Sequence, residues 1–446
     1  MFDNKKIFIL GMARSGYEVA KLLKNHNCNI LITDMKEDIE KIKELESLNI
    51  KVVITDNPID LLDESYDYVV KNPGIKIEHP ICEKASLLNI KVINEVEVAY
   101  HYLPNVSIIG ITGSNGKTTT TTLIYEILKE AKKRVHLGGN IGYPVSSLVP
   151  NCLDNDILVL EISGHQLHDC YDFKTDVSVM TNLEEVHIDH FKTYDNYKDN
   201  KAKIFNHHTN NDLAIYNIGN LDVIDKVKDI KSTKISFTSK DIKSDLYIKN
   251  DSIYYNDELI IKLDDIKIKG NHNYENIMCA IAACKHYNVS NQDIYNVLNR
   301  FNGVEHRIEY VATINGIDFY NDSKATNVKS TQIALKTFNK DTILLLGGLD
   351  RGHSFEELTP YMTNVKLVVC YGETKDRIKK YCDSINIKCI VKDNLHDATF
   401  EAYNNALSNS VILLSPACAS WDQYKSFEER GNEFKDTVLN IGGKKC

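Results

Sequence analysis

The sequence predicts an α/β protein of three domains, and two observations lead to that fold class. The chain has 446 residues, about three times the roughly 150 residues of a typical domain. Apolar strand segments also alternate with helical segments in three successive series, a pattern typical of largely parallel sheets covered by helices. We place the boundaries near residues 97 and 303, which gives domains 1–97, 98–303 and 304–446.

The first series predicts a Rossmann-like, doubly wound sheet. A helix is expected near 17–25, soon after the first strand. The expected strands are 6–10 (KIFIL), 29–34 (NILITD), 51–55 (KVVIT), 66–74 (YDYVVKNPG) and 90–94 (IKVIN).

The second series predicts a P-loop ATPase-type sheet, and the third predicts another Rossmann-like sheet. In the second we expect strands at 106–112, 156–163, 177–182 and 213–217, a helix through 122–133, and a hairpin in 246–263 with Asn-Asp turns. In the third we expect an Asn-Gly hairpin in 313–323 and strands at 342–348, 366–372 and 411–416.

Composition and charge exclude several classes of function. With 53 basic and 62 acidic residues the net charge is -9, so a nucleic-acid partner is not expected. No stretch approaches the roughly 20 apolar residues of a membrane span, and no signal peptide opens the chain, so we expect a cytoplasmic protein without a membrane partner. The 11 cysteines form no C-x-x-C pair, which indicates reduced thiols rather than a zinc site or a disulfide framework.

The segment GITGSNGKTT (110–119) resembles a phosphate-binding loop between a strand and a helix. Two glycines let the backbone approach phosphate oxygens, Lys117 supplies a positive charge, and Thr118 offers a hydroxyl to magnesium at the positive end of the helix. The strict Walker pattern has glycine where this chain has Ile111. A ligand-free turn is the alternative, but the motif favours ATP and Mg²⁺.

A second glycine turn, GMARSG (11–16), opens the chain after its first strand. Asp34 ends the next strand at the spacing where a carboxylate binds a ribose hydroxyl, which alone would predict a nicotinamide oxidoreductase. However, Ala13 places a methyl group where pyrophosphate would touch bare backbone, and Arg14 and Ser15 add polar groups that the redox motif does not need. A plain tight turn and a nucleotide site both stay open, and a mononucleotide-type ligand fits better than NAD.

Acidic and basic residues follow the strands after the second loop. Glu161 ends an apolar strand where P-loop enzymes place the acid that holds magnesium. The segment 181–203 then carries His187, Asp189, His190 and several lysines. A lone histidine is usually structural and a lysine run is usually solvated, so its neighbours do not single out Lys201.

Three loops of the third series carry polar residues. NDSKATN (321–327) contains a cluster able to bind carboxylate or phosphate, with a polar loop built on an Asx turn as the alternative. The segments 346–355 (LGGLDRGHSF) and 413–431 (LLSPACASWDQYKSFEERG) both follow strands, which is where ligands bind in open α/β sheets. Groups of this kind on a closing domain suggest phosphoryl transfer.

Taken in order, the motifs resemble the Mur ligase family, in its D-glutamate-adding branch, over almost the whole chain. They are GITGSNGKTTT, GGNIG, LEIS, NLEEVHIDH, GNHNYEN, HRIE, NDSKATN and LLSPACASWDQ. The resemblance implies ATP-dependent amide formation in peptidoglycan precursor synthesis, with UDP-N-acetylmuramoyl-L-alanine and D-glutamate as small-molecule substrates. It implies an acyl-phosphate intermediate, two magnesium ions, a carbamylated lysine and a monomeric enzyme. No nucleophilic serine or cysteine is needed, so Cys418 receives no chemical role.

The resemblance also implies roles for individual residues. The ATP site would comprise Gly113, Ser114, Asn115, Gly116, Lys117, Thr118, Thr119, Asn273, Asn276, Arg307 and Asp322. Magnesium would be held by Thr118, Glu161, His187 and the carbamate of Lys201. The catalytic set would be Lys117, Asn140, Glu161, His187, Lys201 and Lys324. The uridine nucleotide would contact Arg14, Ser15, Asp34 and Lys36, with Asn140 and Ser163 also on the substrate side. D-Glutamate would contact His187, Lys324, Thr326, Arg351, Ser420 and Phe427.

Some positions depart from the family pattern, and other functions stay open. Gly164 and His165 stand where many members have Ser-Phe, Arg351 stands where some have lysine, and Lys203 lies two residues from Lys201. The main alternative is another Mur-family amide ligase with a different amino acid, or one similar to folylpolyglutamate synthetase. A nicotinamide oxidoreductase and a nucleotide-binding regulator without turnover are the alternatives from other classes.

Overall fold

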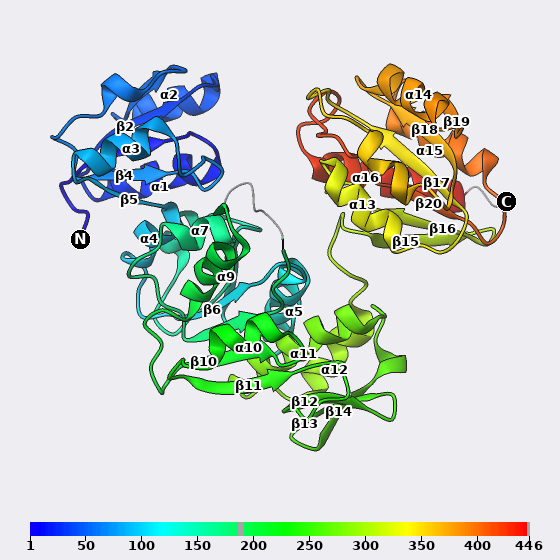
Figure 1. Cartoon of the computed structure of the whole chain (residues 1–446), viewed down its shortest axis with the longest axis horizontal. Helices are drawn as coiled ribbons and strands as arrows, with labels where there is room; N and C mark the ends of the chain where they lie inside the picture. The colour runs from blue at the N-terminus through cyan, green and yellow to red at the C-terminus, as the bar shows by residue number, and fades with distance from the viewer. Residues whose placement is uncertain (186–190, 444–446) are drawn as a thin grey trace. The chain divides into compact units, whose positions relative to one another are not determined.

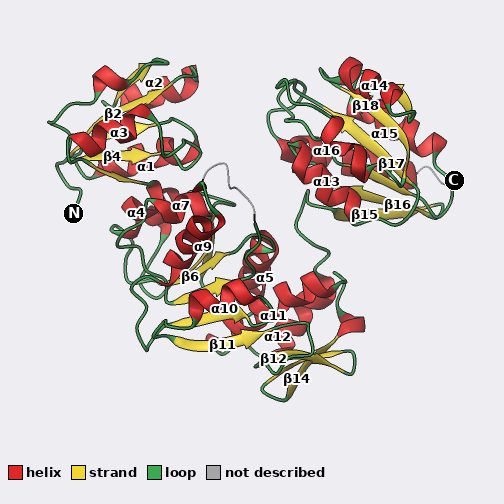
Figure 2. Cartoon of the chain, viewed as in Figure 1, coloured by secondary structure: helices red, strands yellow, loops and turns green. Residues whose placement is uncertain are grey.

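The computed structural model describes residues 1–185 and 191–443, and the chain divides into two compact units, Met1–Phe301 and Asn302–Cys446. Figure 1 follows the course of the chain, and Figure 2 distinguishes the helices from the strands. In the described part, the first unit contains a five-stranded and a nine-stranded sheet, and the second contains a six-stranded sheet. The predicted fold class is therefore confirmed. The exact boundaries remain a proposal, and the one near residue 97 falls within a short helix, Glu95–Tyr100.

The N-terminal sheet is parallel throughout, with the strand order β3-β2-β1-β4-β5. Its strands are β1 (Lys6–Leu10), β2 (Asn29–Asp34), β3 (Lys51–Ile54), β4 (Tyr68–Lys71) and β5 (Lys91–Ile93). Its helices are α1 (Arg14–Asn25), α2 (Ile39–Ser47), α3 (Pro80–Leu87) and α4 (Glu95–Tyr100). The first helix begins three residues before the expected range, so Arg14 and Ser15 lie in its first turn rather than in a loop.

The middle sheet has the order β14-β13-β12-β11-β10-β9-β6-β8-β7 and is parallel from β7 to β12. Its strands are β6 (Ser107–Thr112), β7 (Val135–Gly139), β8 (Ile157–Glu161), β9 (Val177–Met180), β10 (Leu213–Asn217), β11 (Thr233–Phe237), β12 (Leu246–Lys249), β13 (Ser252–Tyr255) and β14 (Glu258–Lys262). The helices are α5 (Lys117–Glu130), α6 (Val145–Leu148), α7 (Gly164–His168), α9 (Tyr194–Ala202), α10 (Leu221–Val227), α11 (Asn271–His286) and α12 (Asn291–Arg300).

The hairpin expected in 246–263 is a three-stranded meander, because both of its Asn-Asp pairs form tight turns. Asn250 and Asp251 have φ of 47° and 52°, and Asn256 and Asp257 have φ of 47° and 65°. Two consecutive residues in the left-handed region are typical of type I′ turns, which match the twist of antiparallel strands. Strands β12, β13 and β14 pair antiparallel on either side of these turns.

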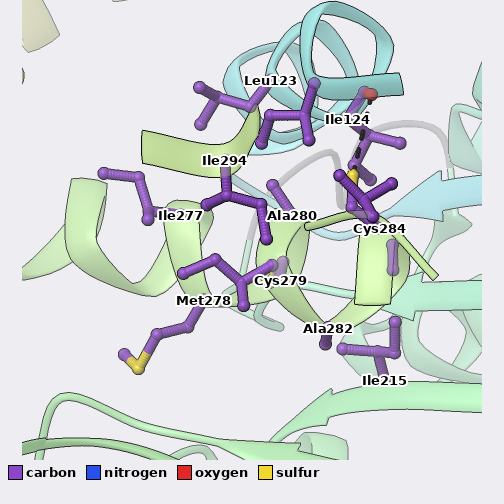
Figure 3. Close-up of a cluster of buried hydrophobic side chains, with 14 of the residues drawn as sticks. Leu123, Ile124, Ile215, Ile277, Met278, Cys279, Ala280, Ala282, Cys284 and Ile294 are labelled. Atoms are coloured by element: carbon purple, nitrogen blue, oxygen red, sulfur yellow. Dashed lines mark hydrogen bonds between the residues drawn. The ribbon is translucent and has the colours of Figure 1, made fainter. Parts of the chain in front are cut away.

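Helices α5 and α11 form the apolar centre of the middle domain (Figure 3). Leu123 and Ile124 on α5 face a continuous run of buried residues, 277–284, on α11. The Cys284 thiol donates a hydrogen bond to the Ile124 carbonyl oxygen at 3.8 Å. Each fully buried Leu or Ile contributes about 1.5–3 kcal/mol, so this cluster fixes the helix that follows the second glycine loop.

Buried polar contacts join the N-terminal sheet to the middle sheet within the first unit. Lys71 Nζ lies 3.0 Å from Asp169 Oδ2, and both side chains are almost fully buried. The carboxylate of Glu97 accepts hydrogen bonds from the backbone N–H groups of 171–173. Glu95 accepts one from the Ser146 N–H, and burial raises the pKa of the Glu95 carboxyl to about 7.

The C-terminal sheet has the order β15-β16-β20-β17-β18-β19, with β15 antiparallel and the others parallel. Its strands are β15 (Glu309–Ile314), β16 (Ile317–Asn321), β17 (Thr342–Gly347), β18 (Val365–Tyr371), β19 (Lys388–Val391) and β20 (Val411–Leu414). Its helices are α13 (Val328–Lys336), α14 (Lys375–Ser384), α15 (Leu395–Asn405) and α16 (Phe427–Gly443). The predicted Asn-Gly turn is present, with φ of 53° at Asn315 and 77° at Gly316. Among the described residues, no helix is both long enough and apolar enough to cross a membrane.

Candidate active site

The phosphate-binding loop lies between β6 and α5 and depends on two glycines. Gly113 has φ of 142° and Gly116 has φ of 80°, a region that residues with a Cβ rarely adopt. An added Cβ would lie 2.0 Å from Thr181 Oγ1 at Gly113 and 2.1 Å from Asn276 Oδ1 at Gly116. The loop therefore needs glycine at both positions, as the motif predicts.

The segment after the neighbouring strand β9 holds this loop in place. Ser114 N–H donates to the Asn182 carbonyl oxygen at 2.9 Å, and Asn115 N–H donates to Asn182 Oδ1 at 2.8 Å. Thr181 Oγ1 donates to the Asn115 carbonyl oxygen at 2.6 Å. Asn182 was not among the predicted site residues, although its place at the end of the strand expected at 177–182 was a usable signal.

Lys117 and the hydroxyl residues after it form the first turn of α5. The Lys117 ammonium donates to the carbonyl oxygens of Gly113 and Ser114, both at 2.9 Å. The positive charge therefore lies over the loop, at the helix end where the first N–H groups have no partner within the helix. Thr118 is buried, whereas Thr119 is half-buried.

Glu161 connects this turn to the end of a neighbouring strand. It ends β8, whose residues are buried, and pairs in register with Ile111 on β6. Its Oε2 accepts a hydrogen bond from Thr118 Oγ1 at 2.8 Å, and its Oε1 accepts one from Asn140 Nδ2 at 2.7 Å. The predicted site residues Thr118 and Asn140 thus both bond to the buried Glu161 carboxylate, which places a carboxylate oxygen next to a hydroxyl oxygen. Such hard oxygen donors suit Mg²⁺.

Lys201, on α9, lies beside the same loop. Its side chain is 2% exposed, and its Nζ is 3.4 Å from Thr112 Oγ1. Burial holds the pKa of this amine well below its usual value, the positive charge of Lys117 lowers it further, and Glu161 partly opposes the shift. Lys203 instead donates to the His168 carbonyl oxygen at 2.9 Å. Of the two lysines, Lys201 therefore lies at the phosphate loop. The predicted ligand His187 lies outside the described residues.

Two asparagines predicted to contact the nucleotide belong to the first turns of α11. Asn276 is buried, and its Oδ1 accepts a hydrogen bond from Thr120 Oγ1 at 3.4 Å. Asn273 is half-buried, and its amide donates to the Lys269 carbonyl oxygen at 3.0 Å. Asn276 thus contacts the phosphate loop, whereas the Asn273 amide bonds to the backbone just before its own helix.

The first glycine turn is built differently, because its polar side chains already bond to other groups of the protein. Asp34 accepts hydrogen bonds from the N–H of Met12 at 2.6 Å and the N–H of Lys36 at 3.0 Å. The Asp34 carboxylate, which was expected to bind ribose, therefore accepts hydrogen bonds from the backbone of the glycine turn and of the segment that follows β2. Ser15 Oγ accepts from Asn72 Nδ2 at 3.1 Å, and Arg14 donates to the Gly142 carbonyl oxygen.

Ser163 also has a local partner. It caps α7 in a capping box with Gln166, in which each side chain bonds to the other residue's backbone N–H. Serine is a preferred residue at the N-cap of a helix, so helix capping alone accounts for Ser163 and no bound ligand is needed to explain it.

In the second unit, the predicted site residue Asp322 is a buried carboxylate. Its Oδ2 accepts a hydrogen bond from Ser415 Oγ at 2.7 Å and its Oδ1 accepts one from Ile308 N–H at 3.2 Å. Burial nevertheless raises the pKa of this carboxyl to about 7, although the charges of Arg307 and Arg430 oppose the shift.

The other predicted residues of this unit lie on three loops. Lys324 Nζ is 5.8 Å from the ring centre of Phe427, and Thr326 N–H donates to the Lys324 carbonyl oxygen at 2.9 Å. Arg351 stacks on Trp421 at 4.8 Å from the ring centre. Ser420 is 1% exposed, and its Oγ hydrogen bonds to none of the described residues. Such a buried hydroxyl without a partner is costly, which favours a ligand at this position.

Arg430 was missed by the sequence prediction, although it organises two of these loops. It is fully buried in α16. Its guanidinium donates to Ser323 Oγ at 3.0 Å, to the Ser323 carbonyl oxygen at 2.8 Å and to the Cys418 carbonyl oxygen at 3.0 Å. An arginine beside two glutamates in a helix is normally solvated, so no local pattern indicated this burial.

Comparison with known proteins places this geometry in a family. Residues 5–94 match the Mur ligase MurD-like N-terminal domain, residues 111–284 the Mur ligase middle domain and residues 306–418 the Mur ligase glutamate ligase domain. A curated protein of Geobacillus sp. (strain WCH70), named UDP-N-acetylmuramoylalanine--D-glutamate ligase, is 44% identical over 99% of this chain and 98% of its own length. The chain belongs to the Mur ligase family.

Further relatives agree with this assignment. A protein of the same name from Bacillus thuringiensis (strain Al Hakam) is 42% identical over 99% of this chain and 98% of its own length. Two solved structures share the fold of this Mur ligase at low identity. The UDP-N-acetylmuramate-alanine ligase of Thermotoga maritima has a TM-score of 0.58 at 16% identity, covering 98% of this chain and 100% of that one. The MurF ligase of the same organism, in complex with ADP, has a TM-score of 0.56 at 17% identity, covering 98% and 96%. The predicted family is therefore confirmed.

Proposed function

We propose that this Mur ligase is an ATP-dependent, ADP-forming amide ligase that adds D-glutamate to UDP-N-acetylmuramoyl-L-alanine. The observation that carries the proposal is the assembly of Lys117, Thr118, Asn140, Glu161 and Lys201 around one phosphate-binding loop. The choice of substrates is supported by the names of relatives that are 42–44% identical over nearly the whole chain. The alternative amide ligases of the family would share the loop and differ in the amino acid.

The proposed reaction has two steps. A terminal L-alanyl carboxylate oxygen attacks the γ-phosphorus of ATP, the bond from that phosphorus to the bridging oxygen breaks, and ADP leaves. The amine of D-glutamate then attacks the acyl phosphate, an N–C bond forms, and phosphate and a proton leave. Catalysis of phosphoryl transfer rests on positioning and charge neutralisation. Lys117 supplies a fixed cation for this, held over the loop by two carbonyl oxygens.

Thr118 and Glu161 fit a magnesium ion, because a hydroxyl and a carboxylate oxygen lie 2.8 Å apart in a buried position. Bound there, Mg²⁺ would neutralise charge on the phosphate oxygens. Asn140 orients the Glu161 carboxylate from its other oxygen. His187 stays a proposed ligand.

We also propose that Lys201 is carbamylated. Only a neutral amine adds to carbon dioxide, forming an N–C bond and releasing a proton, and burial favours the neutral form of Lys201. The product is an anion that could ligate metal close to Thr112. Detection of a 44-dalton adduct by native mass spectrometry, or rescue of a Lys201→Ala variant by short carboxylic acids, would support the carbamate.

We propose the same ligands for the remaining predicted residues as the family resemblance implies. Arg307, Asp322, Asn273 and Asn276 are assigned to the nucleotide of ATP. The residues Lys324, Thr326, Arg351, Ser420 and Phe427 are assigned to D-glutamate, supported by the buried Ser420 hydroxyl. Arg14, Ser15, Asp34, Lys36 and Ser163 are assigned to the UDP-sugar. A monomer is proposed, and light scattering would test it.

Phosphate release from Mg·ATP with UDP-N-acetylmuramoyl-L-alanine tests the function. D-Glutamate, L-glutamate, L-lysine, meso-diaminopimelate or no amino acid would be offered in parallel. We expect release that requires both the nucleotide-sugar and D-glutamate. Release with another amino acid alone would replace the proposed substrate but leave the ligase chemistry, whereas no release with any of them would contradict the activity.

A further inference from the structure

Three cysteine side chains gather on one face of the C-terminal sheet. Cys370 lies on β18, Cys389 on the adjacent strand β19, and Cys382 on α14. Cys370 Sγ and Cys389 Sγ are 3.5 Å apart, and Cys382 belongs to the same buried cluster as Cys370, against which Cys389 packs. Cys389 is half-buried, whereas the other two are fully buried.

The strand register explains why these thiols come together. Cys389 pairs with Val368, and Cys370 lies two residues further along β18, so its side chain points to the same face. Helix α14 covers that face with Ile378, Tyr381 and Cys382.

The contacts make the three thiols chemically unequal. Hydrogen bonds from Cys370 and Cys382 lower the pKa of Cys389, and the positive charge of Lys379 lowers it further. By contrast, burial raises the pKa of Cys82 to about 11. Among the ten described cysteines, Cys389 is the one whose thiolate is favoured by its surroundings. A thiolate that is partly accessible is the reactive form of cysteine.

A disulfide fits this cluster better than a metal site. Among the described residues, only Glu97, His101 and Asp172 bring three ligand atoms within 4.8 Å of one another, so the three sulfurs do not form a compact ligand set. The Cys370 and Cys389 sulfurs need to approach by roughly 1.5 Å from 3.5 Å to reach a disulfide bond, and because the two residues are diagonal neighbours in the strand register, closing the bond also requires the backbone of the strands to move.

We propose that Cys389 and Cys370 form an oxidisable thiol pair that closes a disulfide after reaction with a hydroperoxide. The Cys389 thiolate attacks the terminal oxygen of the hydroperoxide, its O–O bond breaks, and the alcohol, or water from hydrogen peroxide, leaves after taking up a proton. Cys370 then attacks the sulfur of the resulting sulfenic acid, an S–S bond forms, the S–O bond breaks, and water leaves. Two thiols lose two electrons in total, and the hydroperoxide gains them.

This pair is linked to a loop that carries a proposed substrate residue. Cys370 Sγ also lies 3.4 Å from the Lys375 carbonyl oxygen, at the start of α14. Thr374 accepts a hydrogen bond from Gly348 N–H at 3.2 Å, and Glu373 accepts one from Asp350 N–H at 2.9 Å, next to Arg351. A disulfide moves the Cys370 sulfur toward Cys389 and so changes its contact with the start of α14. On the proposed function, we therefore expect oxidation to raise the KM for D-glutamate several-fold.

Peptide mapping tests the disulfide independently of activity. The full-length protein would be treated with hydrogen peroxide, blocked with N-ethylmaleimide, digested with trypsin and analysed without reduction. Cleavage after lysine places the three cysteines on separate peptides, 367–375, 381–388 and 389–392. We expect a cross-link between 367–375 and 389–392 that dithiothreitol reverses. Absence of this cross-link, or a cross-link of 389–392 to 381–388 instead, would overturn the pairing.

Two variants separate the steps. In Cys370→Ser we expect Cys389 to accumulate as a sulfenic acid that dimedone traps, whereas Cys389→Ser should abolish both the adduct and the cross-link. Cys82→Ser, which changes a half-buried thiol in the other unit, is the matched control and should retain the cross-link. In the reduced wild type, iodoacetamide should label Cys389 at least tenfold faster than Cys82, and equal rates would contradict the assigned reactivity. If the disulfide is mapped but the oxidised enzyme has an unchanged KM for D-glutamate, only the proposed link between the disulfide and substrate binding would be overturned.

Discussion

The two glycine loops of the first unit both join a parallel strand to a helix, yet their polar groups point to different tasks. Around the second loop, a lysine, a hydroxyl, an amide and a carboxylate converge on a small volume at the start of α5. Around the first, Asp34 bonds to two N–H groups of its own loop region. A glycine pattern thus shows that a backbone turns tightly, and only the side chains around the turn show whether it is equipped to bind phosphate.

The glycines themselves also differ between the loops. An added Cβ at Gly16 would lie 1.9 Å from the Gly11 carbonyl oxygen, so this glycine permits close packing of α1 against its strand. At Gly116 the obstacle is the end of the Asn276 side chain. The first is a requirement of folding, and the second belongs to the nucleotide site.

The largest expected effect is on Lys117. Lys117→Ala should lower kcat/KM for ATP by about 10²- to 10³-fold, because a fixed charge at the transferred phosphate is lost. Steady-state phosphate release would measure it. Lys129→Ala, at an exposed position of the same helix, is the control. Unchanged turnover in Lys117→Ala would contradict the phosphate-loop assignment.

A smaller effect is expected at Glu95, a buried carboxylate whose pKa is raised to about 7 by its burial. The folded state binds this proton more tightly than the unfolded state, so its contribution to stability is present below about pH 4.5 and is lost as pH rises to about 7. Glutamine cannot ionise, so the variant does not lose this stability as pH rises. The free energy of unfolding of Glu95→Gln minus that of wild type should therefore be larger at pH 8 than at pH 4.5, by on the order of 3 kcal/mol.

Urea unfolding of both proteins between pH 4.5 and 8 would measure this difference. Exposed Glu64→Gln is the control and should follow the wild type. Parallel curves for wild type and Glu95→Gln would show that the carboxyl titrates normally.

Matched glycine substitutions sharpen the comparison further. Gly16→Ala should lower the free energy of unfolding by about 1–3 kcal/mol, because the new methyl group meets backbone that cannot rotate away. Gly116→Ala should cost about 1–2 kcal/mol for its positive φ and should also weaken ATP binding. Thermal unfolding and ATP titration would separate the two, with Gly443→Ala as control, since nothing lies within 4 Å of its added Cβ. Normal ATP affinity in Gly116→Ala would argue against close approach of the phosphates.

The smallest expected effect is on Lys36, which is exposed near the first loop. Because solvent-exposed charges contribute only about 0.2–1 kcal/mol, Lys36→Ala should weaken binding of UDP-N-acetylmuramoyl-L-alanine by at most about fivefold. Surface plasmon resonance or calorimetry would measure it, and Lys24→Ala on α1 would serve as the control. Equal affinities of the two variants would remove Lys36 from the proposed substrate site.

The sequence predicted the sheets and the phosphate loop because both depend on local patterns. Apolar runs such as β8 and the Gly-Lys-Thr run after β6 are readable from a few neighbouring residues. The residues that support the site were harder to predict, because they act over long sequence separations. Arg430 bonds to Ser323, more than a hundred residues earlier. Asn182 bonds to Asn115, and Lys201 is distinguished from Lys203 by its burial beside Thr112.

Calorimetric titration of Mg·ATP into wild type, Lys117→Ala and Lys36→Ala decides which of the two loops binds ATP, since one lysine is removed from each loop region. We expect Lys117→Ala to weaken ATP binding at least tenfold, whereas Lys36→Ala should stay within twofold of wild type. Wild-type affinity in Lys117→Ala together with a loss in Lys36→Ala would instead place ATP at the first loop.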